Sequence, residues 1–481
     1  MVTIRMYNVG LGDCFLLRFE GKAKPWFMLI DCGLFRGSPA ERETLNAVVD
    51  DIAQTTHGRL DVVVATHEHQ DHLSGFWYAQ ESFRAQIQIG QVWLAWTENP
   101  ADPMANALKA TMNGFAEQLE QTMTQLRHDP RRGISPDTLA AVESVLEFAG
   151  FGEPLAANDR LSINQKALRF LKEAPTDPEQ PVLYVEPGSM APVAALPNVR
   201  FFVLGPPRSE LLRKSDPTRS RPEVYHFAGG ERSNYALLIP ATDKTNTDPD
   251  RQDAIPFDSS YQMSITDAQN DPFFCNRYWN DTDPAGTDQR YRRIDNDWLY
   301  AVGDLALQLD GDTNNTSLAL AIELVDSGRV LLFPGDAQVG NWLSWDSCKW
   351  TDFPNLTTQQ LLAKTVFYKV GHHGSHNATL REQGLERMTH PDLVAMIPVD
   401  ETFARQKKKW DMPFGGLYKR LVEKTRGRVI QADGHTPPLP DPRYPSVTDA
   451  TEQQAFLKAL RHSPSNRPGA AWPLWTEYTI G

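Results

Sequence analysis

The 481-residue sequence is poor in cysteine, which limits how the chain can be stabilised. Its four cysteines, Cys14, Cys32, Cys275 and Cys348, lie far apart and form no CxxC pair. A small secreted domain held by disulfides would carry more cysteines at shorter spacing. The spacing therefore favours free, buried thiols in a reducing compartment over a disulfide framework.

Long apolar runs and a secretory leader are also missing. No stretch of about 18 apolar residues occurs, so we expect no membrane-spanning helix and no membrane partner. Residues 1–19 lack the succession of basic, apolar and small residues that forms a secretory signal, and they alternate like a strand. We therefore expect a cytoplasmic protein.

The sequence also has fewer positively charged than negatively charged side chains. The chain has 48 Lys and Arg against 61 Asp and Glu, a formal net charge of −13. This balance argues against broad, charge-driven nucleic-acid binding, because such binding needs cations that neutralise phosphates, although a local basic groove stays open. The remaining composition, 41% hydrophobic, 23% charged and 10% aromatic, is typical of a globular protein and excludes overall disorder or a coiled coil.

Strand and helix patterns alternate along most of the chain. Residues 1–33 contain three strand-like segments, and residues 39–56 have apolar positions at helical spacing. The run LDVVVAT (60–66) is almost continuously apolar and β-branched, which predicts a strand buried on both faces. The mixture returns between residues 316 and 431, so we predict an α/β (α+β) fold of the αββα type, with helices outside two sheets.

The composition changes within residues 208–312, which are rich in Asp, Asn, Pro and Thr and still contain many aromatic residues. A disordered linker would contain few aromatics, so we interpret this segment as an irregular insertion that forms a lid or cap. We expect it to interrupt one main domain over residues 1–440. Residues 441–481 are expected to be a Pro-rich C-terminal extension.

The motif THEHQDH at residues 66–72 is the strongest chemical signal. His67 and His69 are two residues apart at the end of a predicted strand, so their side chains point to the same side. Asp71 and His72 follow where the chain turns into a predicted helix. Imidazole and carboxylate groups are suitable ligands for zinc or a similar ion. Three of only 12 histidines fall within six positions, which argues against a chance cluster.

Two later segments carry further candidate ligands. Asp336 follows the strand-like RVLLFPG, where an acid is either a helix N-cap or a ligand. His372 and His373 follow the strand-like VFYKV, and the glycines around them allow a close backbone approach to a site. Taken alone, this histidine pair fits a ligand pair or a surface loop equally well.

In this order, HxHxDH, Asp and His make the sequence resemble the hydrolases of the metallo-β-lactamase fold. The finer resemblance is to the ComEC-like branch, which includes the hydrolase domain of the competence channel and is similar to phosphorylcholine esterases. Further motifs support it in the expected order: NVGLGDC (8–14), LIDCG (29–33), VRFFVLGPP (199–207), NNTSLAL (314–320), FPGDA (333–337), YKVGHHGS (368–375) and RVIQADG (428–434).

The resemblance implies two divalent metal ions, zinc or manganese. His67 and His69 would bind the first ion, Asp71 and His72 the second, and Asp336 would bridge both. His373 would complete the second site and His372 would face the substrate, so Asp71 and His372 are the predicted catalytic residues. Asp31 would hold a ligand histidine in one tautomer, or else serve only in packing or a turn.

The chain departs from most two-metal members of this group in one respect. Those members carry another histidine ligand between the HxHxDH motif and the bridging Asp, whereas here only His128 and His226 occur in that interval. The ComEC-like branch has an Asn-rich motif there, and Asn314, Asn315 and Ser317 match it, which places them beside the ligands. The first ion is then weakly held or recruited with substrate, and the number of ions stays open.

We predict a phosphodiesterase or nuclease that uses metal-activated hydroxide, because a paired-cation site suits the charge of a phosphodiester transition state. The expected substrate contacts are Ser375, Lys369, Lys408 and Trp410. The basic stretch 404–428 is either a groove that follows phosphates, which would admit DNA or RNA, or a solvated helix face with its loop.

Two alternatives remain from the sequence. One is a hydrolase of small esters, lactones or phosphocholine-type substrates, in which aromatic residues of the insertion form a lid or a cation-binding box rather than simply packing: Phe273, Phe274, Tyr278, Trp279, Trp298 and Tyr300. The other is a subunit of a larger assembly, with a protein partner bound through the insertion or the C-terminal extension and little activity alone.

Overall fold

The computed structural model describes residues 1–21, 24–35, 39–128, 143, 146–147, 161–177, 179, 181–215, 223, 263, 265–279, 308–408, 410–434, 450–470 and 472–481. The chain divides into two compact units. The first consists of Met1–Asn113, Glu147–Gly229 and Asp310–Gly481, and the second of Gly114–Leu146 and Gly230–Leu309. The two sheets and all the predicted metal ligands belong to the first unit.

The first sheet of this unit has eight strands among the described residues. In order across the sheet they are β14 (Leu460–His462), β15 (Trp475–Ile480), β1 (Val2–Tyr7), β2 (Cys14–Phe19), β3 (Trp26–Cys32), β4 (Arg59–Ala65), β5 (Gln88–Ala95) and β6 (Val182–Val185). The half from β3 to the edge strand β6 is parallel, whereas β14, β15, β1 and β2 pair antiparallel in the other half. The apolar β4 is buried at six of its seven positions, as expected for a strand covered on both faces.

The second sheet is also mixed and has seven strands in the described part of the chain. Strands β10 to β13 are parallel, and β7, β8 and β9 are antiparallel to their neighbours. Their order is β13 (Val429–Gln431), β12 (Val394–Ile397), β11 (Thr365–Lys369), β10 (Arg329–Phe333), β9 (Ala319–Leu324), β8 (Val199–Gly205) and β7 (Met190–Ala191).

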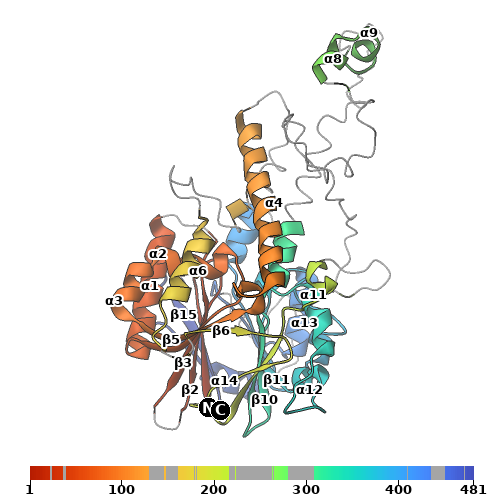
Figure 1. Cartoon of the computed structure of the whole chain (residues 1–481). Coiled ribbons are helices and arrows are strands. Elements are labelled where there is room, and N and C mark those ends of the chain that lie inside the picture. The colour runs from red at the N-terminus through yellow and green to blue at the C-terminus, as the bar shows by residue number, and fades with distance from the viewer. Residues whose placement is uncertain are drawn as a thin grey trace. The chain divides into compact units, whose positions relative to one another are not determined.

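Helices cover the outer faces of the two sheets (Figure 1). On the first sheet these are α1 (Pro39–Thr56), α2 (Gln70–Tyr78), α3 (Gln80–Gln86) and α6 (Ile163–Glu173). On the second they are α11 (Val339–Ser344), α12 (Thr358–Ala363) and α13 (Gly415–Lys424). Helix α6 begins at a capping box between Ser162 and Gln165 and buries Ala167, Leu168 and Leu171, the spacing of an amphipathic helix. The predicted αββα class is confirmed.

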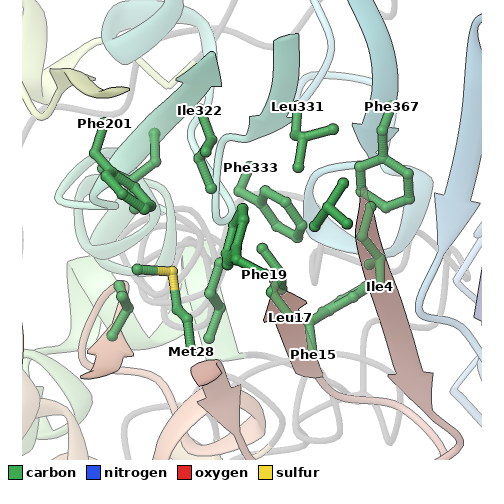
Figure 2. Packing of buried hydrophobic residues seen from close by; sticks show 14 of the residues in the cluster. Ile4, Phe15, Leu17, Phe19, Met28, Phe201, Ile322, Leu331, Phe333 and Phe367 are labelled. Carbon is green, nitrogen blue, oxygen red and sulfur yellow. The ribbon is translucent and has the colours of Figure 1, made fainter. Parts of the chain in front are cut away.

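An apolar core that is rich in aromatic rings fills the space between the two sheets (Figure 2). Phe333 of β10 lies near its centre, with its ring centroid 5.8 Å from Phe15 and 5.3 Å from Phe367. These rings come from β2, β10 and β11, so the contacts hold the two sheets together. Because β10 and β11 end, and β2 begins, close to the predicted ligands, this core also fixes the positions of the chain segments that carry them.

The C-terminal segment differs from the predicted extension. Strand β15 pairs with β1 over its full length, from Val2 with Ile480 to Tyr7 with Trp475, so both end strands are interior to the first sheet (Figure 1). Helix α14 (Ala450–Ala459) also adds Phe456 to the core between the sheets. The segment WTEYTI is short and the residues before it are rich in proline, so its pattern alone did not reveal a strand.

The insertion predicted over residues 208–312 is only partly described. Residues 310–315 form a helical segment of the first unit, which therefore overlaps the predicted insertion. The second unit includes α8 (Ile265–Asn270), α9 (Pro272–Phe274) and a π-helical turn over Cys275–Trp279, and the Phe273 side chain is 56% exposed. Trp298 and Tyr300 lie outside the described residues, and the lid hypothesis stays a prediction.

All four cysteines are free, and Cys14, Cys32 and Cys348 are buried. Within the described ranges, no helix combines the length and the apolar character needed to cross a membrane.

The core between the sheets leads to a stability prediction. Phe333→Ala should lower the free energy of unfolding by about 3–5 kcal/mol, because it removes a buried ring and leaves a cavity. Urea unfolding followed by circular dichroism measures the change. Leu457→Ala, at a side chain that is 51% exposed, is the control and should change stability by less than about 0.5 kcal/mol. Equal effects of the two changes would contradict the proposed core.

Candidate metal centre

The predicted ligands meet where parallel strands of both sheets end. In the first sheet, β3 carries Asp31 and β4 leads directly into the HxHxDH motif. In the second sheet, β10 leads to Asp336 and β11 to the histidine pair His372 and His373. Parallel neighbours place these carboxyl ends at one edge of each sheet, where binding sites of α/β folds are usually built.

Two glycines allow the elements around the site to approach closely. Gly335 has a φ of +60°, and a Cβ atom there would lie 2.9 Å from the Cβ of Ser317 and 3.1 Å from that of Thr66. A Cβ on Gly33 would lie 2.5 Å from backbone atoms of Asp71 and His72. A side chain at either position would therefore push apart the segments that carry the ligands.

His67 and His69 form one half of the site. The Nε2 atom of His67 and the Nδ1 atom of His69 are 3.0 Å apart, and each residue is only 3% exposed. Burial lowers the pKa of His67 well below its usual value and that of His69 to about 4. Both rings are therefore neutral near pH 7, the form in which imidazole binds a metal.

His72 and His373 form the other half, together with two carboxylates. The Nε2 atom of His373 lies 2.8 Å from Oδ2 of Asp71, and that of His72 lies 3.0 Å from Oδ2 of Asp336. Candidate ligand atoms of His67, His72 and Asp336 lie within 4.8 Å of one another, as do those of Asp71, Asp336 and His373. The arrangement brings together all six residues that the resemblance implied as ligands.

The second nitrogen of each of these rings faces a fixed acceptor. Nδ1 of His72 lies 2.7 Å from Oδ2 of Asp31, and Nδ1 of His373 lies 2.6 Å from the carbonyl oxygen of Pro398. Asp31 also accepts hydrogen bonds from the backbone N–H and the hydroxyl of Thr66. These acceptors orient the rings so that each Nε2 atom faces the carboxylates, which is the contact predicted for Asp31.

His373, and not His372, faces the carboxylates of Asp71 and Asp336. The backbone N–H of His372 donates to Oδ1 of Asp336, while its own Nδ1 atom is buried and has no hydrogen-bond partner. The φ values of His372 and His373 are +44° and +52°, and that of Asp31 is +56°. Left-handed backbone at three non-glycine residues costs free energy, and such strain is concentrated at functional sites.

Asp336 is the most strongly stabilised carboxylate of the cluster. Its Oδ1 atom accepts hydrogen bonds from Nζ of Lys369 at 3.0 Å and from the N–H of His372 at 2.9 Å. Burial would raise the pKa of Asp336, but the charges of Lys369 and His72 hold it well below its usual value. Burial likewise opposes protonation of His72, but the charges of Asp336 and Asp71 raise its pKa well above the usual value.

Two buried carboxylate oxygens of the site lack any hydrogen-bond partner, Oδ1 of Asp71 and Oδ1 of Asp310. Nε2 of His72 and Oδ2 of Asp336 face each other at 3.0 Å. A buried polar atom that makes no hydrogen bond costs free energy, and a bound cation would satisfy nitrogen and oxygen donors alike. The donor set of imidazoles and carboxylates fits zinc or another first-row divalent ion. The residues present therefore fit the implied metal ions.

The sequence interpretation missed two acids at this site. Asp13 forms an ion pair with Lys369, and burial raises the pKa of Asp13 to about 6 although that ammonium opposes the shift. Asp310 lies with Oδ1 3.8 Å from Nε2 of His69, and burial, together with repulsion from Asp71 and Asp336, raises its pKa to about 8. Asp13 belongs to the quoted motif NVGLGDC (8–14), and Asp310 lies four residues before the Asn-rich motif, so both were within or close to recognised signals.

Contact of Lys369 with a substrate stays a prediction, and in the structure this residue pairs with acids of the protein. Its side chain is 2% exposed, and its Nζ atom donates to the carbonyl oxygen of Gly335 and to Asp336 as well as pairing with Asp13. β11 is buried at every position, so the side chain points into the protein rather than toward solvent. Lys369 therefore balances the charge of two buried acids.

The Asn-rich motif contacts the ligands at two of its three predicted residues. The backbone N–H of Asp336 donates to Oγ of Ser317, and the Asn314 side chain forms a hydrogen bond with His69. Nδ2 of Asn314 also donates to Oδ2 of Asp310. Asn315 instead bonds the backbone of Lys214, Gln338 and Asn341. It therefore holds the loop after β10 and touches none of the predicted ligands.

The other predicted substrate contacts are engaged within the protein. The hydroxyl of Ser375 donates to Asn377, and Nζ of Lys408 donates to Glu147 and lies 4.5 Å from the ring centroid of Phe35. The Trp410 ring packs on Phe35 with centroids 5.4 Å apart. Contact of Ser375, Lys408 or Trp410 with a substrate stays a prediction.

Most described cations of the basic stretch 404–428 form ion pairs. The pairs are Arg405 with Glu401 and Asp411, Lys408 with Glu147, Arg420 with Glu386 and Glu423, Lys424 with Glu386, and Arg426 with Glu452. Lys409 lies outside the described residues. Because these charges are already balanced, the contacts favour a solvated helix face over a groove that follows phosphates.

Comparison with known proteins assigns part of the chain to a family. Residues 7–154 match the model of the Metallo-beta-lactamase superfamily, so the chain contains a domain of that superfamily. The search of curated proteins finds no match. The broad resemblance is confirmed, whereas the ComEC-like branch stays a prediction.

One similar solved structure is a beta-lactamase domain protein from Burkholderia ambifaria. It has 16% sequence identity and a TM-score of 0.22, over 42% of this chain and 46% of that chain. The chain thus spans about half the length of that protein, and at this TM-score the family assignment rests on the sequence match alone.

The buried ion pairs of Lys369 lead to a second prediction. Lys369→Met should lower the free energy of unfolding by about 3–5 kcal/mol in the presence of a chelator, because two buried acids, Asp13 and Asp336, lose the cation that compensates them. Urea unfolding measures the change.

Lys364→Met is the matched control for this change. Its ammonium lies 3.4 Å from Glu323 but its side chain is 45% exposed, so the expected loss is below about 1 kcal/mol. A loss for Lys369→Met as small as that for Lys364→Met would show that the internal cation is dispensable.

Proposed function

We propose that this protein is a metal-dependent hydrolase that cleaves phosphodiester bonds. The observation that carries the proposal is the group of buried imidazoles and carboxylates that converge from both sheets, with candidate ligand atoms of Asp71, Asp336 and His373 within 4.8 Å of one another. Oδ1 of Asp71 has no hydrogen-bond partner in this group, and a protein without a cation at this point would leave it unsatisfied at a considerable cost. The superfamily match over residues 7–154 supports the same chemistry.

The proposed division of ligands follows the two halves of the site. His67 and His69 would hold one ion, Asp71, His72 and His373 would hold the other, and Asp336 would be shared. Bound cations of this kind lower the pKa of water, polarise the scissile group and stabilise negative charge on the departing oxygen. Zinc and manganese both remain candidates, because imidazole suits the first and carboxylate the second.

The remaining residues prepare the site for this reaction. Asp31 keeps the Nε2 atom of His72 directed at the carboxylates through its contact with Nδ1. Lys369 keeps Asp336 ionised, so that a lone pair is available to a cation. The Nδ1 atom of His372 has no protein partner, so His372 can donate a hydrogen bond to a substrate oxygen.

Phosphodiesters are the proposed substrate class because they gain most from a pair of cations. Their transition state carries more negative charge than that of a carboxyl ester, and paired cations stabilise both the attacking and the departing oxygens. The ion pairs along residues 404–428 leave few uncompensated cations there to follow a polyanion. We therefore propose a short phosphodiester rather than a polynucleotide.

The proposal predicts that Asp336→Ala abolishes metal-dependent hydrolysis. The variant should retain less metal by elemental analysis and lose at least about 100-fold of the turnover of bis(p-nitrophenyl) phosphate, because one substitution removes a ligand of both ions. Asp346→Ala, at a surface acid paired with Arg387, is the matched control and should behave like the unchanged protein.

The choice of substrate in the same assay decides between the competing functions. Cleavage of the phosphodiester but not of p-nitrophenyl acetate supports the proposal. Preferred cleavage of single- or double-stranded DNA over the short substrate would contradict the proposed size limit. Cleavage of the acetate ester alone would overturn the substrate class. A metal-loaded protein that cleaves neither would overturn the proposed activity.

A further prediction concerns Asp31. Asp31→Asn should weaken metal binding about 10–100-fold while the fold is kept, because an amide orients the His72 ring less well than a carboxylate. Isothermal titration of the metal-free protein measures the affinity. Asp61→Asn is the control, since Asp61 also accepts a backbone N–H bond in the first sheet, from Phe27, but lies away from the ligands. Equal affinities in the Asp31 and Asp61 variants would argue for a packing role of Asp31.

A further inference from the structure

We propose that Lys109 is a positioning residue of the metal centre, and that it acts by holding the side chain of Glu68. The inference rests on the proposed metal-dependent function and goes beyond the ligands named there. Glu68 lies between His67 and His69 in the HxHxDH motif. Lys109 lies in α4 (Pro103–His128), within the part of that helix that belongs to the first unit. Neither Glu68 nor Lys109 was among the predicted site residues.

The first observation is that the Glu68 side chain has different partners from the two histidines beside it. Nε2 of His67 and Nδ1 of His69 lie 3.0 Å from each other. Oε2 of Glu68 instead accepts a hydrogen bond from Nζ of Lys109 at 3.1 Å. The same ammonium donates to Oε2 of Glu98 at 2.5 Å, three residues after the end of β5. Lys109 therefore holds the Glu68 carboxylate beside the end of β5 and apart from the histidine contact.

The second observation is that the backbone of the same segment is fixed as well. Nδ2 of Asn164, in α6, donates to the carbonyl oxygen of Glu68 at 3.0 Å, and Asn164 is fully buried. The backbone N–H and the hydroxyl of Thr66 donate to Asp31. The chain is thus held on both sides of His67, and the ion pair with the α4 lysine fixes the side chain of Glu68. Contacts of this kind around a ligand segment set the direction of its imidazoles.

The third observation is that one ammonium serves two acids. Glu68 and Glu98 both lie within 3.1 Å of Nζ of Lys109, so their carboxylates repel each other when that charge is removed. Lys172 of α6 lies 3.6 Å from Oε2 of Glu98 and still compensates that acid. Glu68, whose side chain is only 21% exposed, would then be left without its cation. Its carboxylate would turn away from Glu98, and the histidines on either side would move with it.

The test is metal affinity, which does not depend on activity. Isothermal titration measures the binding of zinc, and separately of manganese, to the metal-free full chain and its variants. Lys109→Met should bind the metal about 10–100-fold more weakly, the range typical of residues that orient a ligand. The direction of this change is decisive, because removing a positive charge near a cation site would by itself strengthen cation binding. A weaker affinity therefore reports lost positioning and not lost charge.

Lys172→Met is the matched control. The Lys172 side chain is 30% exposed and that of Lys109 is 29% exposed, and both pair with Glu98, but Lys172 forms no ion pair with Glu68 in the described part of the chain. Lys172→Met should therefore bind metal at least as tightly as the unchanged protein.

Two further variants test the mechanism. Lys109→Arg keeps the positive charge and should retain most of the affinity. Adding Glu98→Gln to Lys109→Met removes the charge that repels Glu68, so this double variant should recover part of the lost affinity. Circular dichroism and the unfolding midpoint in chelator confirm that each variant is folded. If Lys109→Met does not fold, Lys109→Gln, a polar replacement without the charge, takes its place with the same expectation.

The outcomes separate this inference from the proposed function. An unchanged protein that binds no metal would overturn both. Equal or tighter metal binding by Lys109→Met would overturn the positioning role and leave the hydrolase proposal intact. An equal loss of affinity in Lys109→Met and Lys172→Met would also contradict it, because only the first of these lysines holds Glu68.

Discussion

The ammonium group of Lys369 lies between two buried carboxylates that belong to different sheets. Lys369 ends β11 of the second sheet, Asp336 follows β10 of the same sheet, and Asp13 precedes β2 of the first. Removing three charges from water is favourable only when they compensate one another closely. The triad therefore fixes how the ends of the two sheets meet. This contact joins the start of β2 to the ends of β10 and β11, next to Asp336, which lies 3.0 Å from His72.

The site is costly to build, and the surrounding core compensates for that cost. Asp31, His372 and His373 adopt left-handed backbone, and several polar atoms are buried without partners. Around them, aromatic side chains such as Phe15 and Phe333 pack between the sheets, and the outer helices seal both faces. Natural proteins accept local violations of this kind at functional sites when the remaining structure is strongly determined.

The features that depend on local pattern could be predicted from the sequence. The helix over residues 39–56 follows from the 3.6-residue spacing of its apolar side chains, and β4 from a continuous β-branched run. The cluster of His67, His69, Asp71 and His72 was visible because its members are adjacent in the chain. The predicted αββα class required only the order of such segments.

The features that depend on distant partners could not be predicted. Nothing near Lys369 in the sequence indicates that its charge is matched by an acid more than 350 residues earlier, Asp13. The contact of Asp310 with His69 is hidden for the same reason, because the two residues are 241 positions apart in the chain. The pairing of β15 with β1 likewise joins opposite ends of the sequence. These contacts are set by topology, which single-segment patterns do not encode.

That pairing also constrains how the chain can fold while it is being made. Strand β1 lies between β2 and β15 in the first sheet, yet residues 475–480 leave the ribosome long after residues 2–7. Until then, one side of β1 exposes unpaired backbone groups next to the apolar residues Val2, Ile4 and Met6. An uncovered strand edge of this kind can pair with other chains. During most of its synthesis, the nascent chain therefore has an unpaired strand edge that can associate with other chains. The yield of folded protein depends on protecting this edge until β15 has been synthesised and pairs with β1.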